Sequence, residues 1–282
     1  MRKPIQTFAF LSAALCVSSF GLASTSVAAP KNQQTGCHTE ALNQLERLAP
    51  EGHAVYKAMS DKKLFLVWLT CDDVQLGLAT SVHESVHVLT EERDSFPLIN
   101  GQSVKRPHEV AKFFAPKLAG KNFDSRDSYV QTYIKAGSAS SAENFLYMLD
   151  ELNAYSHDLN SAVKLKSLQR RDRQVDHRDG LTALMAFVTS YTNMARSSQP
   201  ATWQGLQNDN TKQVIQTLWT QAETVVNASC GIPGIGRKDK DYLTFVKDEK
   251  NNGGIAHLLG RAPQISDECL SPSVTSSTKN ST

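Results

Sequence analysis

The sequence predicts an α+β fold that is mainly helical and has a small sheet. Three observations predict it. Segments with apolar residues at helical spacing recur along the chain, one continuous apolar run lies among them, and an Asn-Gly pair separates two short strand-like stretches. The 282 residues contain no internal repeat. We therefore expect one domain over residues 29–270.

The first helix is expected over residues 39–49, where leucines recur at helical spacing. The apolar run KLFLVWLT, residues 63–70, is rich in strand formers and predicts a buried strand. Asn100-Gly101 predicts a two-residue hairpin turn. Residues 231–260 are expected to be rich in loops. Periodicity predicts further helices over residues 140–168, 179–195 and 211–226.

The first 28 residues have the composition of a secretory signal peptide. Arg2 and Lys3 precede an apolar run, and the small residues Ser26 and Ala28 stand where a signal peptidase cleaves. This run is too short and too interrupted to span a membrane, and no later stretch is apolar enough to do so. We expect an exported protein, periplasmic or secreted and of bacterial type, with a disordered Ser/Thr-rich tail over residues 271–282.

The charge balance argues against nucleic acid as a partner. The formal charge of the whole chain is +2, and Arg2 and Lys3 account for it, so the exported chain is close to neutral. Binding to phosphate backbones requires a basic surface. We therefore expect neither a nucleic-acid partner nor a membrane span.

The stretch TSVHESVHVLTEE contains the pattern H-E-x-x-H, formed by His83, Glu84 and His87. It lies in a predicted helix, capped by Asp72 or Asp73, whose apolar face must pack on a core. Residues four apart lie above one another on a helix, so both imidazoles can reach one Zn²⁺. Glu84 is turned by about 100° from His83, where it can act as general base toward a zinc-activated water. The alternative is a helix whose two histidines are hydrogen-bonded to neighbours.

This pattern resembles that of the zincin metallopeptidases, whose catalytic zinc has a third protein ligand. The metzincin extension is absent, because Thr90 and Arg93 stand where its glycine and third histidine would be. Glu91 lies on the same helix but about 12 Å along the axis from His83, too far to complete the site easily, so we expect it to support a ligand from outside or to lie at the surface. The third ligand is therefore expected from elsewhere in the chain.

Gluzincins take that ligand from a later helix, within Glu-x-x-Ala/Ser-Asp. The stretch DELNAYSHD supplies Glu151 and Ala154, with Tyr155 in place of the aspartate, in a predicted helix capped by Ser140 or Ser141. The resemblance covers only these two short motifs. It implies a zincin-like catalytic core, with Glu151 as the third zinc ligand beside the two histidines.

Other side chains near this glutamate have open roles. His157 and Asp158 are the alternative third ligands, and Asp158 could instead orient a ligand histidine. Tyr147 and Tyr155 flank the glutamate at i−4 and i+4, where either could hydrogen-bond an oxyanion or simply pack along the core. The remaining histidines, among them His177, are expected at the surface or in loops.

Four cysteines follow the signal peptide, an even number that suggests two disulfides in an exported protein. Three connectivities are possible, and the simplest pairs near neighbours, Cys37 with Cys71 and Cys230 with Cys269. Each bridge would stabilise the fold by about 3–4 kcal/mol. Free buried thiols are the alternative.

Taken together, the residues and the resemblance predict an exported zinc-dependent metallohydrolase. We expect a peptidase acting on a peptide or protein substrate, with Glu84 as base. The alternatives are a zinc amidase acting on cell-wall peptides and a non-catalytic zinc-binding module. The intact glutamate favours catalysis, because a structural site has no need of a base.

Overall fold

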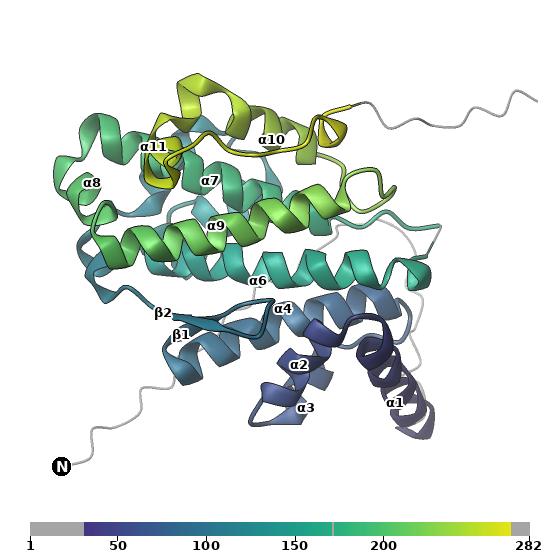
Figure 1. Ribbon diagram of the computed structural model, residues 1–282. Helices are drawn as coiled ribbons and strands as arrows, with labels where there is room; N and C mark the ends of the chain where they lie inside the picture. Colours follow the sequence, from purple (N-terminus) through teal and green to yellow (C-terminus); the bar gives the residue numbers. More distant parts are fainter. Residues whose placement is uncertain (1–30, 171, 272–282) are drawn as a thin grey trace, which may run out of the picture.

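The computed structural model describes residues 31–170 and 172–271 (Figure 1). The expected signal peptide lies outside these residues, and so does all of the expected tail except Ser271. The described chain is mainly helical, as predicted, and its sheet is a single two-stranded hairpin. Among the described residues, each helix is too short or too polar to cross a bilayer.

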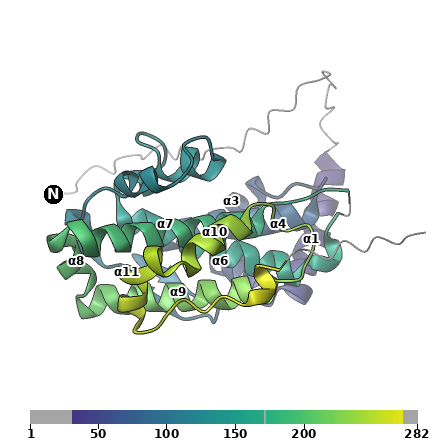
Figure 2. The same ribbon diagram turned by 90° about the horizontal axis from the view of Figure 1, so that it is seen from above.

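Four long helices form the centre of the molecule: α4 (Val74–Arg93), α6 (Phe145–Lys164), α7 (His177–Ser198) and α9 (Asp209–Ser229). Helix α6 packs against the other three. Figure 1 shows α4, α6 and α9 side by side, and Figure 2 shows α7 beside α6. An acid or histidine on the buried sides of α6 therefore meets side chains from several helices.

The shorter helices cover the ends and sides of this group. They are α1 (Lys31–Leu48), α2 (Pro50–Ala58), α3 (Lys62–Val67), α5 (Ser140–Glu143), α8 (Pro200–Leu206), α10 (Asp239–Lys247) and α11 (Glu249–Leu259). Between and after them lie short 3-10 helices, η1 (His108–Lys112), η2 (Pro116–Asn122), η4 (Lys166–Leu168) and η5 (Asp267–Cys269), and one short π-helix, η3 (Val130–Ile134). Helices α10 and α11 pack on α7, and α1, α2 and α3 pack with α4.

The core has two parts, separated by the α4–α6 contact. The larger part is built from apolar side chains of α6, α7 and α9, with Trp219, Tyr191 and Phe187 fully buried. The smaller part lies among α1 to α4 and includes Leu78 and Val82 from the predicted apolar face. Burial of both faces is what holds α4 and α6 together.

Helices α4 and α6 run antiparallel, and buried polar contacts set their register. Asp73 caps α4, as one of the two predicted alternatives, by accepting from a backbone N–H of the first turn. Near that end, Gln75 donates to the carbonyl of Ala162 at 2.8 Å. Toward the other end, His87 contacts Asp150 at 2.6 Å. The second motif of the sequence is thereby brought opposite the first.

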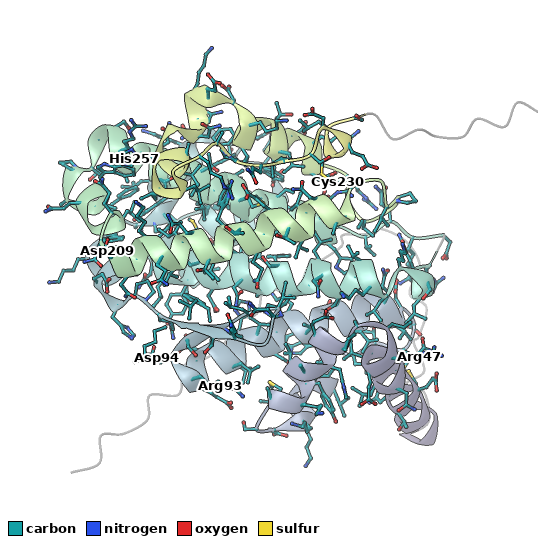
Figure 3. The ribbon with its side chains drawn as sticks, viewed as in Figure 1. Arg47, Arg93, Asp94, Asp209, Cys230 and His257 are labelled. Atoms are coloured by element: carbon teal, nitrogen blue, oxygen red, sulfur yellow. A yellow bond between two sulfur atoms is a disulfide. The ribbon has the colours of Figure 1, made fainter. Side chains whose placement is uncertain are left out.

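The hairpin is confirmed, but the loop between its strands is longer than the predicted two residues. β1 (Ser95–Pro97) pairs antiparallel with β2 (Ser103–Lys105), so five residues connect the strands. Gly101 has φ +82, which explains the Asn-Gly signal within this loop. Figure 3 shows the hairpin leaving the end of α4 at Arg93 and Asp94.

The predicted strand over residues 63–70 is wrong, because this segment begins with helix α3. The side chain of Asp61 caps that helix by accepting from Lys63 N–H at 2.9 Å. Only Phe65 of the helix is fully buried, while Val67 is 69% exposed. No strand of the described chain lies beside this run, so its backbone is satisfied by helical hydrogen bonds instead.

Two further boundary predictions are wrong. The helix predicted over residues 140–168 is broken, because Asn144, rather than Ser140 or Ser141, caps α6 and leaves α5 as a separate turn. Residues 231–260 are not mainly loop, since α10 and α11 occupy most of them. These two helices bury Leu243, Val246, Ile255 and Leu258 against α7, a contact that local composition does not reveal.

Both predicted cysteine pairs are confirmed. Cys37 and Cys71 have Cα atoms 6.2 Å apart and tie α1 to the segment that precedes α4. Cys230 and Cys269, with Cα atoms 4.8 Å apart, tie the end of α9 to η5 (Figure 3). The disulfides fit an exported protein.

Candidate metal centre

The two histidines of the motif meet Glu151 across the α4–α6 contact. The Nε2 atoms of His83 and His87 are 3.2 Å apart. The Oε2 atom of Glu151 lies 3.6 Å from the first and 3.5 Å from the second. These three atoms converge on one point, as the sequence predicts for ligands of a single ion, and the group could hold a metal ion.

The donor atoms themselves fit a metal. Among the described residues, no hydrogen-bond donor satisfies the buried Oε2 atom of Glu151, although two imidazole nitrogens face it. An unsatisfied buried carboxylate oxygen costs free energy, and a cation between it and the nitrogens would remove that cost. Two imidazoles and one carboxylate form a donor set of catalytic zinc sites.

The site is nearly enclosed. The side chains of His83, His87 and Glu151 are 9%, 16% and 16% exposed. Burial of these groups follows from their place at the border of the packed faces of α4 and α6. Because little solvent reaches these side chains, charge interactions among them are stronger than at the surface.

Asp150 orients one of the ligand histidines, a role that the sequence did not predict. Its Oδ2 atom accepts from Nδ1 of His87 at 2.6 Å, and its side chain is only 6% exposed. This contact places the proton of His87 on Nδ1 and leaves Nε2 to face the ion. The only sequence signal for it is that Asp150 directly precedes the predicted ligand glutamate.

Charge and burial affect the two histidines differently. Burial, together with the neighbouring His87, holds the pKa of His83 well below its usual range. Burial would also lower the pKa of His87, but the carboxylates of Asp150 and Glu151 outweigh it and raise that pKa well above its usual range. A proton on Nε2 of His87 would compete with a metal ion for that nitrogen.

Glu84 is half-buried beside this group and is not one of the three converging ligands. Burial raises the pKa of its carboxyl, and the negative charges of Glu151 and Asp158 raise it further, against the effect of His87. A carboxylate with a raised pKa is a stronger proton acceptor. Glu84 thus places a carboxyl of raised pKa next to the three converging side chains.

Tyr155 packs on the metal group, whereas Tyr147 does not. The ring of Tyr155 meets that of His83 edge-on, with centroids 4.5 Å apart, and its hydroxyl lies 2.7 Å from that of Tyr133. The ring of Tyr147 instead lies under the guanidinium of Arg106, 5.7 Å away. The predicted oxyanion contact of Tyr147 therefore has no support in its position.

Tyr133 belongs to the π turn η3, and the sequence did not single it out. The sequence around it, SYVQTYI, fits a strand as well as a helix, so no pattern indicates where the ring points. Gly180 of α7 makes room for the neighbouring Tyr155, because a Cβ atom there would overlap that ring. Helices α6 and α7 and turn η3 therefore fix this pair of phenols together.

The alternative ligands lie elsewhere. His157 donates from Nε2 to the carbonyl of Pro97 at 3.0 Å, and burial lowers its pKa to about 4. Asp158 contacts Nδ1 of His177 at 2.7 Å, so it does not orient His83 or His87 as predicted. His177 is 3% exposed, and its predicted surface position is wrong.

Glu91 is a surface acid, one of its two predicted roles. Its carboxylate lies 2.9 Å from a guanidinium nitrogen of Arg106, and its side chain is 39% exposed.

Comparison of the chain with protein-family models, curated proteins and solved structures finds no match. The chemistry of the metal centre is therefore inferred from its own geometry.

Proposed function

We propose that this protein is a zinc-dependent hydrolase that cleaves amide bonds in peptides. The observation that carries the proposal is the convergence of His83, His87 and Glu151, with the acid Glu84 beside them but outside the ligand set. A site that only holds metal needs the first three groups. A hydrolase also needs a general base, and Glu84 is the group that would supply it.

Each protein group then has a separate task. His83, His87 and Glu151 hold the ion, and Asp150 holds one imidazole in the orientation that binding requires. A bound Zn²⁺ supplies a Lewis acid that polarises the substrate carbonyl and lowers the pKa of water. Glu84 accepts the proton from the attacking water and can pass it to the leaving amine.

The enclosure of the site does not separate a hydrolase from a module that only binds metal. Because the three ligand side chains are at most 16% exposed, a metal-binding module without catalysis would have the same appearance. A zinc amidase acting on cell-wall peptides would use the same groups on another substrate. Metal content and hydrolysis must therefore be measured on the same variants.

The deciding variant is Glu84→Gln, which keeps the size of the side chain and removes its basicity. We expect wild type and variant to bind about one zinc per chain. Cleavage of a mixed peptide library and of purified cell-wall peptides should fall by about 10²–10⁴-fold in the variant. Glu91→Gln on the same helix is the matched control and should retain both properties, because the ion pair of Glu91 is with Arg106 and not with a candidate ligand.

Three outcomes contradict the proposal. Wild type without zinc, after dialysis against Zn²⁺, removes its basis. A Glu84→Gln variant that loses zinc shows that this residue is a ligand, and one that retains full hydrolysis shows that the base lies elsewhere. Zinc-loaded wild type that cleaves neither substrate favours the non-catalytic module.

A further inference from the structure

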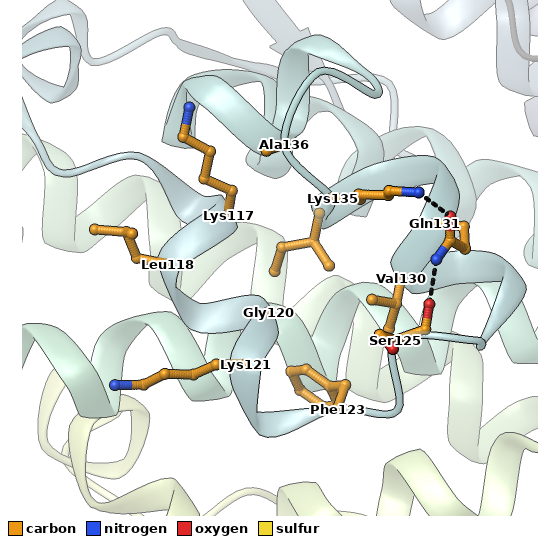
Figure 4. Close-up of a pocket in the computed structure, with 11 residues that line it drawn as sticks. Lys117, Leu118, Gly120, Lys121, Phe123, Ser125, Val130, Gln131, Lys135 and Ala136 are labelled. Atoms are coloured by element: carbon orange, nitrogen blue, oxygen red, sulfur yellow. Dashed lines mark hydrogen bonds between the residues drawn. The ribbon is translucent and has the colours of Figure 1, made fainter.

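A second site lies away from the metal centre, in an open hollow of about 640 Å³ between η2 and η3 (Figure 4). Its floor is apolar. Val130 and Ile134 are buried there, and Phe123 is held by Phe187, with ring centroids 4.9 Å apart. Leu118 at the rim is 49% exposed, one of three large apolar side chains in the described chain with such exposure.

The rim of the hollow is basic. Lys117, Lys121 and Lys135 line it, and among the described lining residues none is acidic. Lys117 is neutralised by Glu143 at 2.6 Å. Lys135 donates to the neutral amide of Gln131 at 2.6 Å and keeps its net charge. Lys121 and Lys135 therefore place positive charge beside an apolar surface, and neither forms an ion pair with an acid of the described chain.

The hollow is separate from the metal centre, although both share η3. Val130 and Ile134 of this turn line the hollow. Tyr129 and Tyr133 of the same segment instead line a second, much smaller pocket together with Tyr155, which packs on the metal group. A ligand in the hollow would thus contact different side chains from a substrate at the metal.

We propose that this hollow binds a single-chain organic anion, an alkyl carboxylate. Its chain lies on the apolar floor of Val130, Ile134 and Phe123, and its carboxylate is attracted by the positive charges of Lys121 and Lys135, which lie on opposite sides of the hollow. The volume is in the range of small-molecule sites. Apolar contact supplies affinity, and the lysines select an anion over a neutral or cationic molecule of the same length.

Isothermal titration with dodecanoate, decanoate and octanoate below their micelle concentrations tests the proposal. Removing two methylene groups should weaken binding by up to about tenfold. Dodecyltrimethylammonium, with the same chain and the opposite charge, should bind more weakly than dodecanoate by about tenfold. The affinity for dodecanoate should be the same with and without Zn²⁺ in the metal centre, because the hollow contains no ligand residue of that centre.

Surface variants test the location. Lys121→Glu combined with Lys135→Glu should weaken dodecanoate by about tenfold, and so should Leu118→Asp. Both changes affect exposed side chains and leave the core intact. Lys112→Glu, an exposed lysine outside the hollow, is the matched control and should change the affinity by less than about twofold.

Several results would overturn the proposal. Undetectable dodecanoate binding at millimolar concentration excludes the site. Equal affinity for the anionic and cationic amphiphiles shows that the lysines do not select the ligand. Equal affinity of the double lysine variant and the Lys112→Glu control shows that any binding lies elsewhere on the molecule.

Discussion

Removal of the Asp150 carboxylate should weaken metal binding without removing any ligand atom. Asp150 accepts from His87 Nδ1 at 2.6 Å and is 4% exposed as a residue. A hydrogen bond to a charged group contributes about 1.5–3 kcal/mol, which corresponds to about 10- to 100-fold in an equilibrium constant. Loss of partners that orient metal ligands has the same magnitude.

Two substitutions of Asp150 separate the contribution of its charge from that of its hydrogen bond. Asp150→Asn keeps an oxygen that can accept from the imidazole but removes the charge, so zinc affinity should fall by about tenfold. Asp150→Ala removes both and should cost nearer 100-fold. Zinc affinity is measured by competition with a chromophoric chelator at fixed pH, on protein whose fold is checked by circular dichroism.

Asp158→Asn is the matched control for these variants. Asp158 is a buried acid on the same helix, but its partner at 2.7 Å is His177 and not a ligand histidine. Its zinc affinity should stay within about threefold of wild type, because no ligand loses its orientation. An unchanged affinity in Asp150→Ala, or equal losses in the Asp150 and Asp158 variants, would refute the reasoning.

Three further predictions concern stability. Gly180→Ala should destabilise the fold by about 1–3 kcal/mol in urea unfolding, because overlap with a buried ring outweighs the gain in helix propensity; an unchanged midpoint would contradict it. Replacing both Cys37 and Cys71 by serine should cost about 2–4 kcal/mol, whereas reduction of wild type without any loss would show that the bridge contributes nothing. The third is a pH effect. Burial would lower the pKa of His177, but the carboxylate of Asp158 outweighs it and raises that pKa. The ion pair therefore stabilises the folded state fully below the unfolded pKa of about 6.5 and less as pH rises through the higher folded value. His177→Gln, unfolded in parallel across that window, should lack this decline, and equal declines in both proteins would show that another group causes it.

The sequence by itself determined the parts of the metal centre that follow from local geometry. Helical spacing puts His83 and His87 on one face and turns Glu84 away from their ligand point, whatever surrounds the helix. The apolar face beside them required a packed neighbour, and the resemblance to gluzincins implied Glu151 as the third ligand. Near-neighbour pairing of the cysteines was also sufficient to predict both bridges.

The local sequence pattern did not predict the correct secondary structure where one composition is compatible with two structures. The run at residues 63–70 is apolar enough for a strand, but a strand needs a partner, and the described chain offers none beside it. Helices α10 and α11 are only 9 and 11 residues long, too short to be stable alone, and one face of each packs on α7. Such outcomes depend on what lies next to a segment.

Only the tertiary structure decided which groups complete the centre. Asp150 and Tyr133 contact partners that are far away along the chain, and no spacing rule connects those partners to them. The antiparallel register of α4 and α6 chose Glu151 over Asp158 as the acid that faces the imidazoles. The physical reason is that a helix fixes the relative positions of its own side chains, whereas the distance between side chains on two helices depends on how their buried faces pack.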